Sequence, residues 1–198
     1  MSGTVMQGFF QNPMADPYII GISSGAALGA TLAIATGLDF WFFGLSGVGL
    51  FAFAGALVVT VVVYAISLRG GRLPATVVLL SGIALGSLAA ALTSYMMISV
   101  NDGADVQRIL FWLMGSLYQT NWLILCVGGP LIVVSVGLQL YFAGDLNKLY
   151  AGELAAKSSG VDVAKLTERA LIACAIAVGS VAAWSMMQDS ACAQDVLL

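Results

Sequence analysis

The chain of 198 residues has little charge and no histidine. Only 9% of its residues are charged, whereas about 25% is usual in a soluble domain. Without histidine, the chain cannot assemble a Ser-His catalytic pair or an HExxH metal site. These two kinds of site are therefore excluded, and we expect no enzymatic activity and no bound cofactor or metal in this chain.

The sequence has instead a series of long apolar runs, separated by short charged gaps. A helix needs roughly 20 apolar residues to cross a bilayer. No run carries Lys, Arg, Asp or Glu in its middle, where one charge costs about 2.5–3.5 kcal/mol. The pattern predicts an all-α, polytopic transmembrane bundle in membrane lipid, with short outer and inner loop helices. The predicted spans are the five runs 18–38, 41–67, 76–100, 121–143 and 168–187.

The basic residues predict an orientation for this bundle. Cytoplasmic loops of membrane proteins carry an excess of lysine and arginine. Six of the seven basic residues lie in or next to the gaps 68–75 and 144–167, and the opposite side has only Arg108. We therefore expect these gaps and the N-terminus in the cytoplasm, and the C-terminus outside.

Two short stretches resemble functional motifs but do not complete them. Residues 21–25, Gly-Ile-Ser-Ser-Gly, match the GxSxG elbow of serine hydrolases, but no histidine or membrane-depth lysine could activate the serine. Residues 152–158 faintly resemble a phosphate-binding P-loop, with Ala156 where that motif requires glycine. We expect neither hydrolysis nor ATP binding by this chain. Its net charge of −3 gives no reason to expect a nucleic-acid partner.

Small residues recur at four-residue spacing in two of the predicted spans. Gly21, Gly25 and Gly29 in the first span would share one helix face, as would Gly82 and Gly86 in the third. Such faces allow neighbouring backbones to approach closely. Plain helix packing and packing around a substrate path need the same residues, so the pattern does not separate the two.

Two loops contain short apolar segments. In the outer loop, residues 109–114 are too short to span a bilayer and predict an interfacial or re-entrant helix, acting as a lid or as part of an outer gate. In the inner loop, Leu146, Leu149 and Tyr150 form an apolar stripe, and Gly152 can break the helix. We expect two short helices that present an apolar ridge to the cytoplasm. The ridge would lie on the membrane surface or dock a cytoplasmic partner.

Four segments of the chain, taken in order, resemble one known family. The stretch 11–29, which begins Gln-Asn-Pro-Met-Ala-Asp-Pro, is joined by 80–86, 111–116 and 149–161. These segments are similar to those of FecCD-type permeases, the membrane subunits of ABC importers for iron-siderophores, haem and cobalamin. Each match alone is moderately specific, and together they cover residues 6–183.

The resemblance implies a division of labour between subunits. The chain would be the permease subunit of an ATP-driven, binding-protein-dependent importer of metal chelates such as iron-siderophores or cobalamin. It would dimerise with a second permease copy and dock a cytoplasmic ATP-binding subunit that hydrolyses ATP. An extracytoplasmic substrate-binding protein would deliver the cargo. The location would be a bacterial-type inner membrane.

The resemblance also assigns roles to residues by their position. The ATPase-coupling loop would include Leu149, Ala151, Gly152, Glu153, Ala155, Ala156 and Gly160. The third span would line the translocation pathway, at Thr93, Ser94 and Tyr95. The inner loop before the first span would be shaped by Asn12, Pro13, Asp16 and Pro17.

The sequence departs from the family pattern in two ways. Family members have more spans than the five predicted here, and the polar segment 188–198 does not continue their pattern. We therefore expect residues 1–187 to form a single permease domain, partial relative to the family, followed by an unrelated tail. The alternatives are a small membrane channel or secondary carrier, a membrane scaffold or intramembrane enzyme, or a truncated permease without transport function. A charged group at mid-span depth would favour a carrier, and the predicted spans contain none.

Overall fold

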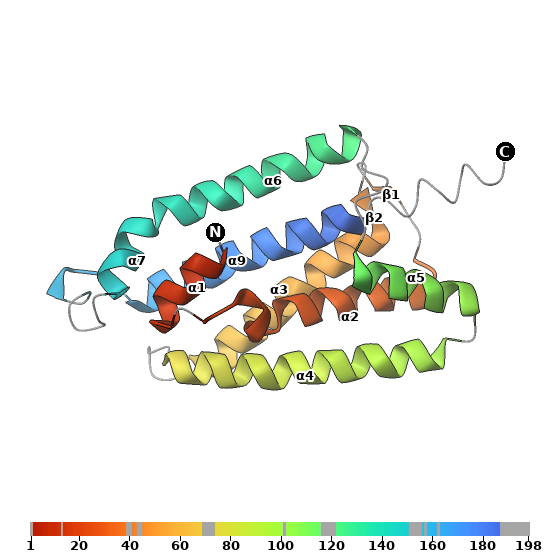
Figure 1. The fold of residues 1–198 in the computed structure, drawn as a ribbon, viewed down its shortest axis with the longest axis horizontal. Coiled ribbons are helices and arrows are strands. Elements are labelled where there is room, and N and C mark those ends of the chain that lie inside the picture. Colours follow the sequence, from red (N-terminus) through yellow and green to blue (C-terminus); the bar gives the residue numbers. More distant parts are fainter. Residues whose placement is uncertain are drawn as a thin grey trace.

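The chain folds into a bundle of helices with one small hairpin (Figure 1). The computed structural model describes residues 2–12, 14–38, 41–42, 45–68, 74–100, 102–115, 122–150, 156, 158–161 and 163–186. Its elements are α1 (Ser2–Phe10), the 3-10 helix η1 (Pro17–Ile20), α2 (Ile22–Ala35), β1 (Trp41–Phe42), β2 (Leu45–Ser46), α3 (Gly47–Ser67), α4 (Ala75–Ser99), α5 (Gly103–Met114), α6 (Trp122–Tyr141), α7 (Ala143–Tyr150) and α9 (Val163–Met186).

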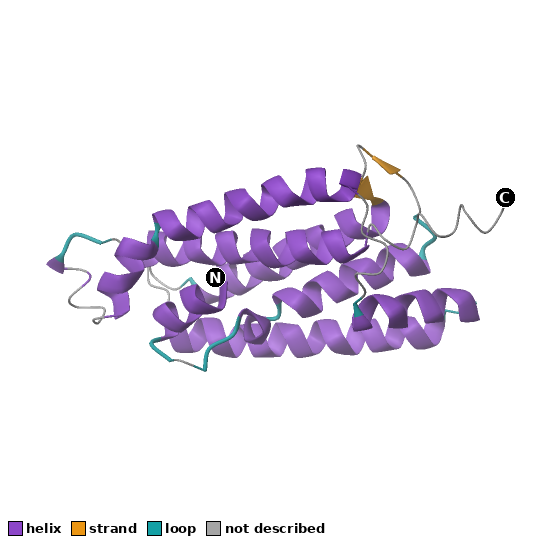
Figure 2. Ribbon diagram, turned by 45° about the horizontal axis from the view of Figure 1, so that its top comes forward, coloured by secondary structure: helices purple, strands orange, loops and turns teal. Residues whose placement is uncertain are grey.

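The long helices run side by side along one common direction (Figures 1 and 2). Among the described residues, α3 with 21 residues and α4 with 25 are long and apolar enough to cross a membrane. Helices α6 and α9 have 20 and 24 residues and pack against each other. The all-α helical bundle predicted from the sequence is confirmed.

The predicted inner and outer loops lie at opposite ends of this bundle. Helix α7, the end of α3 and the start of α4 gather at one end, whereas α5 and the hairpin lie at the other (Figure 1). In the hairpin, β1 and β2 are antiparallel, with Trp41 opposite Ser46. The described elements that flank the two sets of predicted loops thus lie at opposite ends. Which end faces the cytoplasm stays a prediction.

The first predicted span, 18–38, is wrong as a continuous helix. The Asp16 carboxylate accepts a hydrogen bond from the Tyr18 backbone N–H at 2.8 Å and so begins the 3-10 helix η1. Gly21 then adopts the left-handed conformation, with φ +79°, and interrupts the helical ladder. Helix α2 therefore has only 14 residues, and Gly21 precedes it instead of sharing its face.

Three other boundaries differ from the prediction because of local capping and pairing. The second span becomes helical only at Gly47, where Ser46 accepts a hydrogen bond from the Gly49 backbone N–H at 3.2 Å. The outer turn is already the first turn of α5, because the Asp102 carboxylate accepts from the Ala104 N–H at 2.9 Å. The fifth span starts before residue 168, since the structure gives α9 from Val163.

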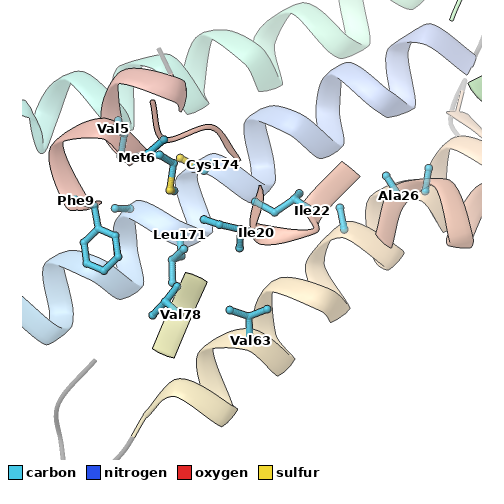
Figure 3. Close-up of a cluster of buried hydrophobic side chains, with 14 of the residues drawn as sticks. Val5, Met6, Phe9, Ile20, Ile22, Ala26, Val63, Val78, Leu171 and Cys174 are labelled. Atoms are coloured by element: carbon cyan, nitrogen blue, oxygen red, sulfur yellow. The ribbon is translucent and has the colours of Figure 1, made fainter. Parts of the chain in front are cut away.

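Helix α1 was not predicted, yet its apolar face is part of the core. Val5, Met6 and Phe9 are buried, and they lie near Leu171 and Cys174 of α9 (Figure 3). Figure 1 shows that α1 begins part-way along the bundle and runs toward the end that holds α7. The segment has no long apolar run, so hydropathy did not reveal it.

Helices α2 and α3 touch through glycine. A Cβ added at Gly25 would lie 2.6 Å from Val59 Cγ2 and 2.7 Å from the Gly55 carbonyl oxygen. A Cβ added at Gly29 would overlap the Phe51 carbonyl oxygen. Gly25 and Gly29 therefore lie where α2 meets α3, and Gly55 is the partner that the spacing did not show.

Gly21, Gly82 and Gly86 form a second close contact, between the start of α2 and α4. A Cβ at Gly21 would lie 2.8 Å from Gly86 Cα, and one at Gly82 would lie 2.8 Å from Ile20 Cα. The left-handed backbone at Gly21 is thus pressed directly onto α4, where no side chain fits. This contact fixes the level in the bundle at which α2 begins.

Polar bridges join α9 to two neighbouring helices. The Tyr64 hydroxyl of α3 donates to Glu168 Oε2 at 3.2 Å. The Ser135 hydroxyl of α6 donates to the Ala173 carbonyl oxygen at 3.1 Å. Both α3 and α6 are therefore held to α9 by directional bonds as well as by apolar packing.

Candidate functional site

A cavity of about 450 Å³ lies between α2, α4 and α5. Helix α2 contributes Ser23 and Ser24, α4 contributes Thr93 and Ser94, and α5 contributes Trp112. The break before α2 brings the two serines to the cavity, because the Gly21 contact sets the start of α2 against the middle of α4. No charged side chain is among the described residues that line it.

The cavity lining offers hydrogen-bonding groups without charge. The hydroxyls of Thr93 and Ser94 donate to the carbonyl oxygens of Ala89 and Ala90, at 2.9 and 3.0 Å. Their oxygens keep lone pairs that can accept further hydrogen bonds. The indole N–H of Trp112 is buried and has no partner among the described residues. Such a lining can bind an uncharged or amphipathic solute, and it contains no nucleophile–base pair.

The structure divides the three residues predicted to line the pathway. Thr93 and Ser94 line the cavity, whereas Tyr95 is 69% exposed and is not among the lining residues. Ser23 and Trp112 were missed as lining residues, since one lay in a discounted GxSxG match and the other in a presumed interfacial helix. The signal that could have identified Ser23 is the presence of small polar residues shortly after Gly21, a glycine that can break a helix.

The predicted inner-loop residues lie between α1 and α2. The Asn12 side-chain oxygen accepts a hydrogen bond from the Met14 backbone N–H at 2.9 Å, and Asp16 caps η1. Pro17 is the first residue of η1, and Pro13 lies outside the described residues. Side chains of Asn and Asp commonly fix tight turns by bonding to the backbone two residues on.

The predicted coupling loop is described only in part. Leu149, Ala156 and Gly160 lie among the described residues, and the others, Ala151, Gly152, Glu153 and Ala155, lie outside them. Leu149 is 3% exposed and Ala156 is fully buried. The prediction that Leu146 and Leu149 form an exposed ridge is wrong, because both are buried in the cluster that also contains residues of α1. Helix α7 is one of the two short helices expected here.

The chain is similar to known import permeases. Residues 1–185 match the FecCD transport family. The cobalamin import permease BtuC of Halobacterium salinarum is 43% identical over 182 residues, which cover 92% of this chain and 47% of that protein. The hemin transport permease HmuU of Yersinia pestis is 36% identical over 186 residues, 93% of this chain and 55% of that protein. The molybdate import permease MolB of Haemophilus influenzae is 34% identical, with the same two coverages.

The fold, like the sequence, resembles that of a known transporter. A solved ABC transporter described as of metal-chelate type, in an inward-facing conformation, superposes with a TM-score of 0.82 at 30% identity. The match covers 92% of this chain and 56% of that one, so the chain spans about half the length of the relatives it matches. A transport family agrees with the prediction that the chain is not an enzyme. By sequence match and by fold, the chain belongs to the FecCD transport family.

Proposed function

We propose that this chain forms part of the permease of an ATP-driven, binding-protein-dependent importer. The observation that carries the proposal is the family match over residues 1–185, with import permeases among the similar proteins. The likeness to an inward-facing ABC transporter supports it independently. ATP would be hydrolysed by a separate cytoplasmic subunit, and a substrate-binding protein would deliver the cargo from outside.

We propose a metal chelate of the iron-siderophore, haem or cobalamin type as the cargo. Similar permeases are named for cobalamin, hemin and molybdate. Recognition of a small oxyanion favours arginine, lysine or several aligned donors. The described lining of the cavity has no charged side chain and presents hydroxyls, methyl groups and one indole. That chemistry suits a large amphipathic chelate better than a free oxyanion.

We propose that a second permease copy packs against α4. Apolar side chains on this helix are exposed, among them Leu80, Leu88 and Ile98. In a membrane such a face can meet lipid, but the cavity beside it and the family match favour a second copy. Thr93 and Ser94 would then line the pathway. Tyr95, which points away from the cavity lining, would face the second copy.

The ATPase would dock on residues 149–160, and the binding protein would meet the opposite end. In the sequence this segment follows α7, which lies at the same end of the bundle as the end of α3 and the start of α4 (Figure 1), and these helices flank the basic gaps. Coupling residues such as Gly152 and Glu153 would contact the ATPase there. The end with α7 would thus face the cytoplasm of a bacterial-type cell, in agreement with the excess of basic residues.

Replacing Glu153 by glutamine should weaken docking of the ATPase. The permease would be co-purified with its cognate ATP-binding subunit, and the dissociation constant measured by titration. We expect Glu153→Gln or Gly152→Leu to raise it about tenfold or more, as loss of an interface hot spot does. Asp105→Asn makes the same chemical change on α5, at the other end, and should leave docking unaltered. Equal docking by all variants would refute the assignment of this segment.

Thiol labelling should show which end of the bundle faces the cytoplasm. In a chain whose native cysteines are replaced, Lys148→Cys on α7 and Gln107→Cys on α5 each place an exposed thiol at one end. An impermeant maleimide added to sealed cells should label position 107 and spare position 148. The reverse pattern would overturn the orientation and, with it, the docking site.

A further inference from the structure

Gln11, just after α1, has an unusual backbone conformation. Its φ is +51°, and it is the one non-glycine residue with positive φ in the described part of the chain. The Asn12 N–H donates to the Gln7 carbonyl oxygen at 3.2 Å, which closes the end of the helix. Helices that end in this way usually have glycine or asparagine in the left-handed position. A glutamine at this place points to a role for its side chain.

The Gln11 side chain reaches a distant part of the chain. Its Nε2 donates to the Leu149 carbonyl oxygen at 2.9 Å, across 138 sequence positions. Leu149 is next to last in α7, and the last four carbonyl groups of a helix have no partner within it. Gln11 therefore supplies a hydrogen-bond donor to the C-terminus of α7. This is the point where the proposed ATPase-docking segment begins.

From Gln11 the chain leads to the cavity through a series of fixed turns. The side chains of Asn12 and Asp16 each accept a hydrogen bond from the backbone two residues on, at 2.9 and 2.8 Å. Helix η1 follows and ends at Gly21, whose backbone is pressed onto α4. Two residues later, Ser23 lines the cavity. A displacement of Gln11 would therefore be passed to the cavity wall over a short stretch that is held by local hydrogen bonds and by the contact of Gly21 with α4.

We propose that Gln11 is a positioning residue that couples the ATPase-docking segment to the cavity. The inference rests on the proposed function, because it needs an ATPase to move that segment. When the end of α7 shifts, the bond to Gln11 moves the end of α1, and with it η1 and the start of α2. Hydrogen bonds and rigid helices that have two discrete arrangements can carry coupling of this kind between distant sites.

Variants at this position separate the hydrogen bond from the backbone. Gln11→Gly keeps the left-handed conformation, which glycine adopts freely, and removes the donor. Gln11→Glu keeps the side-chain length, but its ionised carboxylate cannot donate. Gln11→Lys restores a donor, with a charge that the C-terminus of a helix favours. Gln107→Glu, an exposed glutamine on α5, is the matched control.

The experiment measures how nucleotide changes access to the cavity. The full chain, with native cysteines replaced and with Ser94→Cys as the reporter, is reconstituted in vesicles with its ATPase. The rate of modification by N-ethylmaleimide is then compared with and without a non-hydrolysable ATP analogue. Coupling energies in such networks correspond to about 2- to 30-fold effects. We expect Gln11→Gly and Gln11→Glu to reduce the nucleotide response by such a factor, and Gln11→Lys to restore it.

ATPase docking and thermal unfolding are measured on every variant, so that a loss of coupling can be told from a loss of docking or of folding. A full nucleotide response in Gln11→Gly and Gln11→Glu would overturn the inference, as would a Gln11→Lys chain that folds and docks but does not recover. If Gln11→Gly does not fold, the comparison of Gln11→Glu with Gln11→Lys shows whether the nucleotide response needs a hydrogen-bond donor at this position. The proposed function is refuted if the chain with Gln11 intact does not dock the ATPase, or if nucleotide does not change the modification rate of its reporter cysteine. The inference about Gln11, which depends on that function, is then refuted as well.

Discussion

Replacing Gly29 by alanine should destabilise the protein by about 3 kcal/mol, the upper end of the usual cost of overpacking. The added Cβ would overlap the Phe51 carbonyl oxygen and lie 2.8 Å from the Phe51 carbonyl carbon. Both atoms belong to the backbone of α3, so no side-chain rotation relieves the clash. Helices α2 and α3 would have to separate, which would also disturb the contact between Gly25 and Gly55.

Unfolding of the purified chain in detergent, followed by circular dichroism over a denaturant titration, measures this loss. Gly137→Ala is the matched control, because nothing lies within 4 Å of a Cβ added there in α6. Alanine exceeds glycine in helix propensity by about 1 kcal/mol, so the control should be as stable as the parent or slightly more so. A Gly29→Ala chain as stable as the parent would show that α2 and α3 do not pack as described.

The glycine spacing allowed the close helix contact to be predicted, but not its geometry. Gly25 and Gly29 are four residues apart, and only small residues let two helices meet there. Their partner Gly55 has no glycine four residues before or after it, so the four-residue spacing does not mark it. Gly21 continues the same spacing yet breaks the helix, because Asp16 begins a separate 3-10 helix before it. Hydropathy cannot show such a break, since the flanking residues are apolar on both sides.

The apolar stripe in the inner loop shows a second limit of prediction from sequence patterns. The spacing of Leu146 and Leu149 identified an apolar face of a short helix, but periodicity does not say what covers it. The cover is α1, whose small and polar residues formed no recognisable span, and both leucines are buried beside its apolar face. The predicted ridge is thus part of the core. If the segment 149–160 docks the ATPase, as we propose, the contact would be made by its other residues.

The residues predicted to line the pathway show how much of a site a family resemblance can identify. The resemblance pointed to α4, and two of the three residues that it named there line the cavity. Tyr95 does not, because one residue along a helix turns the side chain by about 100°. Ser23 and Trp112 come from α2 and α5, whose positions depend on the helix break and on the outer loop. Only tertiary structure brings these residues together with Thr93 and Ser94.

Replacing Ser94 by tryptophan should close the cavity and reduce import roughly tenfold or more, a change of at least about 1.4 kcal/mol in the barrier. The serine side chain is small, exposed to the cavity and donates a hydrogen bond to the Ala90 carbonyl oxygen in the preceding turn of its own helix. An indole at this position would occupy the space between α4 and α5, beside Trp112. Because Ser94 is exposed, the protein should still fold and still dock the ATPase.

Uptake of labelled cobalamin and of hemin, assayed separately in vesicles with the ATPase and binding protein, measures the effect. Ser94→Ala is the control, because it changes the same position without filling the cavity. It should retain import. Normal import by Ser94→Trp would mean that the cargo does not pass this cavity, since an indole there leaves no room for a chelate.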